Sequence, residues 1–195
     1  MAMSDKELVR RCQADSAAFE EIVRRYRRAV FAYARISTGS HQDAEEVTQD
    51  VFVKVFRAAH QFNSRYSFTT WLYKITSNTC KNKMRGRRKK QTVSLDDEES
   101  PLVTLSHEAS PLDAYRKNIE IAEVRNAINE LPPRYKQVLY LRYVESLSYR
   151  EIAETLGLSM GNVEARIFRG KERVRWRLLR KLGGYNASRP AESGE

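Results

Sequence analysis

Apolar side chains recur every three or four residues in two separate stretches of this 195-residue chain, and the pattern stops between them. That spacing places the apolar residues on one face of a helix, so both stretches favour helices over strands. With only 8 Gly and 5 Pro, the chain also has too few turn formers for a strand-rich sandwich or barrel. The expected fold class is therefore all-α, with two small helical domains.

Charge divides the chain at the same place. The net charge is +10, yet residues 91–115 contain six acidic residues and no Lys or Arg. Seven of the ten residues in 81–90 are basic, and eight more basic residues lie in 166–181. Each basic run alone could be a solvated helix face, but two runs that each close a helical module indicate contact with nucleic acid. Residues 91–115 are expected to be a flexible acidic linker, or an anionic segment that lies in a channel built for nucleic acid.

Four helices are expected in the first stretch. Ser4 and Glu7 have the spacing of a capping box at a helix start. A second helix follows residue 15, and a third is expected over about 43–60. A fourth should begin with Thr69 or Thr70 as its cap and continue to about residue 85. The residues expected to face the core of the second and third helices are Phe19, Ile22, Tyr26, Val30, Tyr33, Ala44, Val47, Val51, Val55, Phe52 and Phe56.

A loop rich in aromatic residues precedes the fourth of these helices. Its rings would be unfavourable in water, so they either pack the helices together or meet a partner. Unpaired bases stack on aromatic rings, amides read base edges, and cations hold the phosphate backbone. The loop and the polar face of the fourth helix supply all three types of side chain. The candidate residues for an unpaired strand are Phe62, Tyr66, Phe68, Trp71, Asn78, Lys81 and Asn82.

The third expected helix carries a mixed polar face opposite its apolar row. This face combines acids, an amide and bases, namely Glu46, Gln49, Asp50, Lys54 and Arg57. It is suited to docking on another protein, and it is equally compatible with simple solvation.

The second stretch carries the pattern of a helix-turn-helix. A helix over about 133–144, with Tyr143 among its inward residues, is followed by a capping box at Ser148 and Glu151. Gly157 supplies a left-handed turn, and Ser159 caps a longer basic helix. We therefore expect this module to bind DNA, the alternative being a helix-turn-helix used only for protein contacts.

The outer face of the last helix gives the candidates for reading duplex DNA. Arg166 and Arg169 can pair bidentately with guanine or hold phosphate, and Glu164 can accept from a cytosine amino group. Arg173 is expected to contact the backbone or remain solvated. The full candidate set is Asn162, Glu164, Ala165, Arg166, Phe168, Arg169 and Arg173.

Other classes of function find little support. The three His residues do not cluster with Cys or acidic residues, there is no glycine-rich phosphate loop, and no catalytic motif is evident, so we expect no enzyme, no metal and no cofactor. Cys12 and Cys80 are expected to be reduced and partly buried, although a redox pair stays open. No apolar run approaches the roughly 20 residues that span a bilayer. A cytoplasmic protein without membrane insertion is expected.

At this point the chain resembles a bacterial sigma factor of the extracytoplasmic-function (ECF) group. The motifs are DAEEVTQDVF at 43–52, SFTTWLYKI at 67–75 with NTCKN at 78–82, LP at 131–132, LSYREIA at 147–153 and VEARIFR at 163–169. They resemble, in this order, the polymerase-clamp helix, the promoter-melting and −10 recognition segment, and the −35 reader of region 4. Glu164 and Ala165 stand where family members often carry a basic residue followed by Ser, so no base preference is carried over.

The resemblance implies a region 2 domain over 1–90, the linker over 91–115, a region 4 domain over 116–185 and a disordered tail over 186–195. It implies core RNA polymerase as partner, through its β′ clamp helices and β flap, with Glu46, Gln49, Asp50 and Lys54 on the clamp. It further implies promoter DNA at both domains and control by an anti-sigma factor. The rival interpretations are a DNA-binding regulator that needs no polymerase and an enzyme that acts on nucleic acid.

Overall fold

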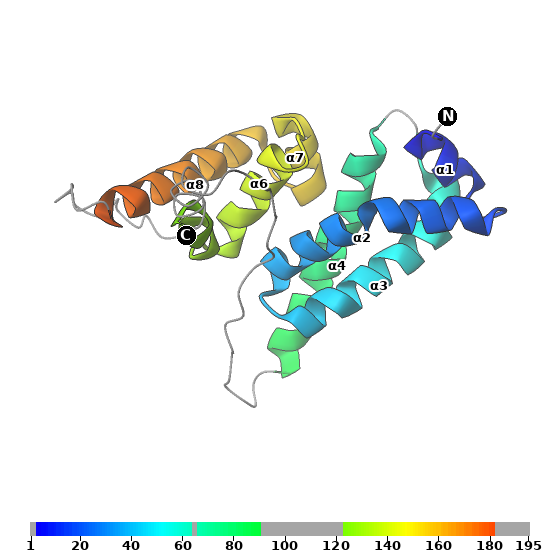
Figure 1. Ribbon diagram of the computed structural model, residues 1–195, viewed down its shortest axis with the longest axis horizontal. Helices are drawn as coiled ribbons and strands as arrows, with labels where there is room; N and C mark the ends of the chain where they lie inside the picture. Colours follow the sequence, from blue (N-terminus) through cyan, green and yellow to red (C-terminus); the bar gives the residue numbers. More distant parts are fainter. Residues whose placement is uncertain (1–2, 64–65, 91–122, 182–195) are drawn as a thin grey trace, which may run out of the picture.

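The computed structural model describes residues 3–63, 66–90 and 123–181, and all of its regular elements there are helices (Figure 1). The first body contains α1 (Asp5–Arg11), α2 (Ser16–Thr38), α3 (His41–Ala58), the short 3-10 helix η1 (Ala59–Gln61) and α4 (Phe68–Lys90). The second contains a helix over 123–129, α6 (Pro133–Tyr143), α7 (Tyr149–Leu156) and α8 (Met160–Lys181). The predicted all-α class is confirmed. The proposed linker and tail lie outside the described residues.

The first body is built on α2, which packs against α1, α3 and α4. Asp15 caps α2 by accepting from the backbone N–H groups of Ala17 and Ala18, and Gly39 ends it with a φ of 74°. Ile22, Val30 and Tyr33 are fully buried, as the period of three to four predicted. Phe56 is instead 39% exposed and packs edge-on against Phe19.

The start of α4 differs from the prediction. Thr69 and Thr70 lie inside the helix, and the cap is Ser67, whose Oγ accepts from the backbone N–H of Thr70 at 3.1 Å. The sequence does not distinguish Ser67 from Thr69 and Thr70, because all three are hydroxyl residues close together and each of them can cap a helix.

The second body has the helix-turn-helix that the sequence predicts. Ser148 and Glu151 form both hydrogen bonds of a capping box at the start of α7. Gly157 ends α7 with a φ of 68° and a ψ of 44°, a left-handed conformation that favours glycine. Ser159 accepts from the N–H of Asn162 at the start of α8.

One inward residue of this body was predicted wrongly. Tyr143 at the end of α6 is 60% exposed. It follows the helical period, but the side of α6 on which it stands borders an open apolar pocket rather than a closed core.

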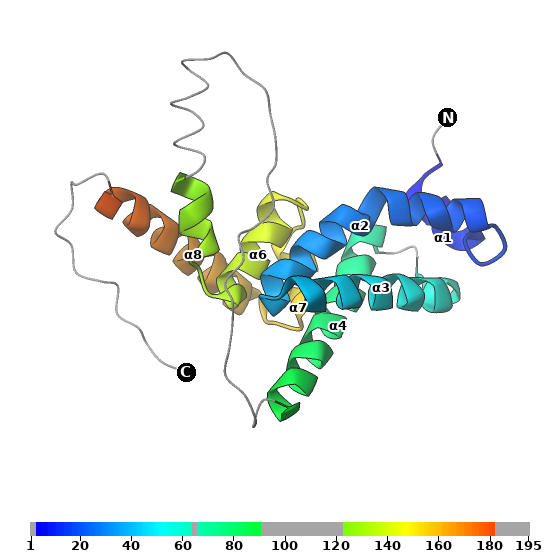
Figure 2. The ribbon, with the colours of Figure 1, turned by 60° about the horizontal axis from the view of Figure 1, so that its bottom comes forward.

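The two bodies contact each other, an arrangement that a flexible tether alone does not predict. The end of α2 packs on α6 and the first half of α4 packs on α7, and the two views place them side by side (Figures 1 and 2). Tyr140 of α6 reaches the first body, where its hydroxyl donates to the carbonyl oxygen of Ala29 at 3.1 Å. None of the described helices is both long and apolar enough to cross a membrane.

Candidate nucleic-acid interface

The outer face of α8 is the surface best suited to enter a DNA groove. Val163 and Ile167 are buried beneath it and fix the rotation of the helix. Asn162, Glu164 and Arg169 are exposed on the opposite side, as predicted. Phe168 is 66% exposed and Met160, which the sequence analysis did not select, is 45% exposed. An exposed apolar ring among polar side chains is suited to contact a thymine methyl group.

The three candidate arginines of α8 lie in different environments. Arg166 is half-buried, Arg169 is exposed, and neither has a polar partner among the described residues. Arg173 lies with its guanidinium over the ring of Tyr135, 5.3 Å from the centroid. Ala165, which precedes Arg166, is half-buried. This geometry leaves Arg166 and Arg169 as the candidates for base contacts, whereas Arg173 is positioned further along the helix.

Most rings of the aromatic loop and of the start of α4 pack against one another rather than facing solvent. Phe68 is only 3% exposed and its ring contacts Tyr26, Phe62 and Trp71 at 5.0 to 6.0 Å between centroids. Phe62 and Trp71 are half-buried and lie 5.3 Å apart. Tyr66 is the exception, since its side chain is 48% exposed. Of the four aromatics assigned to an unpaired strand, Tyr66 alone is well exposed here.

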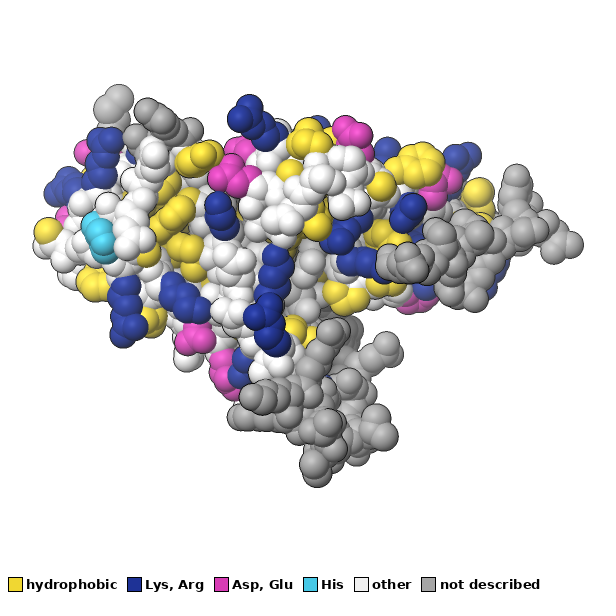
Figure 3. Space-filling model, turned by 180° about the vertical axis from the view of Figure 1, so that it is seen from behind, with side chains coloured by type: hydrophobic (Ala, Val, Ile, Leu, Met, Phe, Trp, Pro, Cys, Tyr) yellow, Lys and Arg dark blue, Asp and Glu magenta, His cyan; other side chains and the backbone are white. Residues whose placement is uncertain are grey.

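The outer face of α4 combines amides with cations. Asn78, Lys81 and Asn82 are exposed, and Arg85 continues the same side one turn later. Figure 3, which shows the molecule from behind, has a column of Lys and Arg side chains down the middle of this face. The Nζ of Lys81 donates to the carbonyl oxygen of Leu156 at 2.7 Å, so this cation is already in contact with the second body.

The face of α3 is available to a protein partner and is braced by α4. Glu46, Gln49 and Asp50 are exposed, and so is Val53, an apolar residue on the same face that sequence reasoning missed. Lys83 of α4 forms ion pairs with Glu46 and with Asp43, and Arg87 pairs with Asp43 at 3.4 Å. The Nζ of Lys54 is turned toward α4 and donates to Thr79 Oγ1 at 3.0 Å. In the sequence, Val53 lies outside the apolar row of this helix, on its polar side. An apolar residue among polar ones could have indicated a protein contact there.

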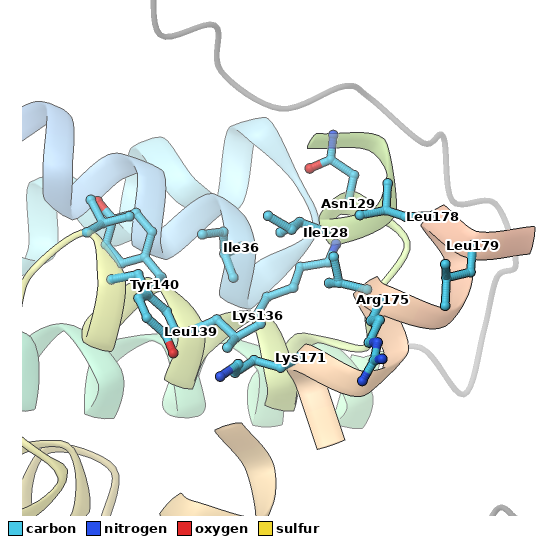
Figure 4. Close-up of a pocket in the computed structure, with 13 residues that line it drawn as sticks. Ile36, Ile128, Asn129, Lys136, Leu139, Tyr140, Lys171, Arg175, Leu178 and Leu179 are labelled. Carbon is cyan, nitrogen blue, oxygen red and sulfur yellow. The ribbon is translucent and has the colours of Figure 1, made fainter. Parts of the chain in front are cut away.

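A large apolar pocket of about 620 Å³ lies on the second body (Figure 4). Ile128, Leu139 and Leu178 are among its walls, and Ile36 of α2 closes one side. Among the described residues that line it, none is acidic, and the cations are Lys136, Lys171 and Arg175.

No cluster in the described part of the chain has the make-up of a metal site. Within those residues there is no group of three His, Cys, Asp or Glu side chains that could hold an ion. Cys12 and Cys80 are both buried, and neither forms a disulfide. Burial raises the pKa of Cys80 to about 11 and raises that of Cys12, so both thiols are protonated near neutral pH.

Two family models match the chain in the order of its two bodies. The model for sigma-70 region 2 matches residues 22–90, and that for sigma-70 region 4 matches residues 121–174. The first range holds the α3 and α4 surfaces, and the second holds α7 and most of α8.

Curated relatives extend this similarity along the chain. The RNA polymerase sigma-H factor of Pseudomonas aeruginosa is 35% identical over 176 residues, which are 87% of this chain and 91% of that protein. The ECF RNA polymerase sigma-E factor of Escherichia coli K12 is 32% identical over 178 residues, 88% of this chain and 93% of that protein. The ECF RNA polymerase sigma factor SigE of Mycolicibacterium smegmatis is 32% identical over 165 residues, but the match spans 62% of its length.

Solved structures agree at the level of the fold. CnrH, in complex with the cytosolic domain of CnrY, gives a TM-score of 0.60 at 25% identity, covering 89% of this chain and 96% of CnrH. The sigma factor RpoE, in complex with the anti-sigma factor NepR from Bartonella quintana, gives a TM-score of 0.66 at 22% identity, with 82% and 96% coverage. Because relatives more than 30% identical are matched over nine-tenths of their length, this chain belongs to the ECF family of RNA polymerase sigma factors.

Proposed function

We propose that this chain is the promoter-specificity subunit of RNA polymerase, which binds the core enzyme and directs it to start sites without performing chemistry of its own. The observation that carries the proposal is the exposed face of α8, set on a helix-turn-helix, in a chain that also presents a polar face on α3. A DNA-binding regulator that needs no polymerase would use the first surface and leave the second without a role.

The two proposed DNA contacts have different roles: one recognises duplex DNA and the other holds unpaired bases. In the proposal, α8 enters the major groove at −35 with Asn162, Glu164, Arg166, Phe168 and Arg169. The outer face of α4, with Tyr66 beside it, holds unstacked bases of the −10 strand. Trapping unpaired bases opens the duplex, which groove contacts alone do not do, so melting draws on captured bases and polymerase contacts.

The polymerase contacts use the two remaining surfaces. The α3 face, with Glu46, Gln49 and Asp50, is assigned to the β′ clamp helices, and exposed Val53 adds an apolar contact about one turn further along the helix. The apolar pocket is assigned to the β flap, the second polymerase contact that the family resemblance implies; its apolar walls and basic rim would suit an apolar segment flanked by acidic residues (Figure 4). A function in complex with polymerase places the protein in the cytoplasm.

Control by an anti-sigma factor is part of the proposal. It is supported by RpoE, a fold neighbour whose structure was solved together with an anti-sigma factor. Such a partner would act by covering the surfaces assigned above.

The experiment that tests the polymerase assignment is capture of core polymerase by the tagged chain. Asp50→Lys should lower the captured amount about tenfold, since a single charge reversal within an interface costs on the order of 1–2 kcal/mol. Glu20→Lys is the matched control, because Glu20 is an exposed acid that belongs to α2 and not to the α3 face. Failure of the unsubstituted chain to capture polymerase would favour the independent regulator.

A further inference from the structure

A cluster of polar contacts ties α7 to α4 between the two bodies. Glu151 Oε1 accepts from the hydroxyl of Thr70 at 2.9 Å and from that of Ser67 at 3.2 Å. One helical turn later, the Nζ of Lys74 lies 3.5 Å from Glu154 Oε1. Together with the bond from Lys81 to α7, these contacts follow one side of α4 over four turns.

Glu151 is held in place from its own side as well. Its Oε2 accepts from the backbone N–H of Ser148 at 2.9 Å and from the Ser148 hydroxyl at 2.7 Å. Burial alone would raise the pKa of Glu151, but the hydrogen bonds from Ser148, Thr70 and Ser67 outweigh it, so the pKa is lowered. The contact therefore presents a charged and well-oriented carboxylate to α4.

The surface of α4 that α7 covers adjoins the surface assigned to the −10 strand. The α7 contacts come from positions 67, 70, 74 and 81, which share one side of the helix at 3.6 residues per turn. Trp71, Asn78 and Asn82 follow the neighbouring stripe, less than a quarter turn away. Lys81 belongs to both sets, since it is an expected phosphate contact and also the donor to Leu156.

The edge of α7 that faces α4 is negatively charged, which is unfavourable for a DNA strand lying beside it. Glu151 and Glu154 bring two carboxylates to this edge of α4, where phosphates would have to lie. Lys74 and Lys81 are the cations that would neutralise those phosphates, and both point to α7 instead. The carboxylates would repel the phosphates, Lys74 is paired with Glu154, and Lys81 is hydrogen-bonded to a backbone carbonyl, so α7 and the strand cannot both use this edge at once.

A second set of contacts keeps the bodies together on the other side. Gln137 of α6 donates to the hydroxyl of Ser37 at 3.0 Å, and the ring of Tyr140 packs edge-on against the rings of Tyr33 and Tyr73. The closed arrangement is therefore held by two sets of contacts, one between α6 and the first body and one between α7 and α4, and only the α7–α4 set borders the expected DNA surface.

We propose that α7 and the unpaired −10 strand compete for one surface of α4, so that the free chain holds itself in a closed form that excludes the strand. This inference rests on the proposed function, in which α4 reads that strand. Binding requires α7 to leave, so the apparent affinity for single-stranded DNA is the affinity of the open form multiplied by the fraction of chain that is open.

The test uses the variants Glu151→Gln and Glu154→Gln, singly and combined. They are compared with a control that carries the same change in charge elsewhere in the chain. Gln at 151 preserves the capping-box pattern. Glu7→Gln with Glu20→Gln is the control, since both side chains are exposed and lie on α1 and α2 rather than in the contact between α7 and α4. Fluorescence anisotropy with a labelled single-stranded −10 oligonucleotide measures affinity, and energy transfer between dyes on the two bodies measures their separation. Circular dichroism confirms that each variant folds.

The double Gln variant should bind the oligonucleotide at least about fivefold more tightly, with a larger separation between the bodies. The control should stay within about twofold of the unsubstituted chain. Equal tightening in the control, or a larger separation with unchanged affinity, would overturn the inference. Promoter-directed transcription by the unsubstituted chain tests the proposed function separately, so either can fail while the other stands.

Discussion

Tyr140 of α6 packs its ring edge-on against Tyr33 of α2, with 5.9 Å between the ring centroids. Tyr33 is fully buried in the first body, whereas Tyr140 belongs to the second. This pair is the point at which the cores of the two bodies meet, and it shows how closely they are joined.

Tyr140→Ala should loosen that junction. The variant loses the ring contacts with Tyr33 and Tyr73 and the hydrogen bond to Ala29, so we expect a loss of roughly 2–4 kcal/mol in the free energy of unfolding. Thermal unfolding by calorimetry measures this, and the two bodies should begin to unfold separately. Tyr143→Ala is the control, because Tyr143 is 60% exposed, and equal losses in both variants would contradict the assignment.

Asn78→Ala should weaken the opening of promoter DNA and spare the −35 contact. Asn78 is exposed on the outer face of α4, which the proposal assigns to the −10 strand, whereas the −35 contacts are assigned to α8. Permanganate footprinting of the open complex should show a clear loss of reactivity. Binding of a −35 duplex should be unchanged, and parallel loss in both measurements would argue against two separate DNA contacts.

Arg169→Ala should lower affinity for the −35 duplex by about 1–3 kcal/mol if the guanidinium pairs with guanine. Arg169 is exposed and has no polar partner among the described residues, so it is available to a base. Titration with the specific and a scrambled duplex measures the change. A loss of the same size on the scrambled duplex would reduce Arg169 to a phosphate contact.

Both cysteines should react slowly in the native protein. Cys80 is 3% exposed and Cys12 is 1% exposed. The raised pKa of each thiol keeps it protonated, and for Cys80 the thiolate forms only as the pH approaches about 11. Reaction with a chromogenic disulfide at pH 7 should therefore be complete only after a denaturant is added. Rapid reaction of one thiol without denaturant would reopen the redox interpretation.

The helices themselves were readable from the sequence because local patterns determine them. Ile22, Val30 and Tyr33 repeat at helical spacing and are buried, and the Ser148–Glu151 capping box forms as its spacing requires. Gly157 likewise takes the left-handed conformation that its place between two helices predicts. Each of these features depends on residues within one or two turns.

The contacts between the bodies were not readable, because they join residues far apart in the chain. Nothing near Glu151 indicates that its second oxygen meets Thr70, which is 81 positions away. The same limit explains Tyr143, whose helical spacing is correct but whose side of α6 meets a pocket. Phe68 illustrates the reverse case, since an aromatic in an expected loop is buried by Tyr26 and Trp71.

The most direct test of the proposed sigma-factor function is run-off transcription by core RNA polymerase on a library of promoter fragments, with and without the purified chain. We predict that adding the chain produces discrete transcripts from a small set of fragments, and that Arg169→Ala and Asp50→Lys each reduce them. Transcription that is no different with the chain present, although the chain still binds DNA, would contradict its assignment as a sigma factor.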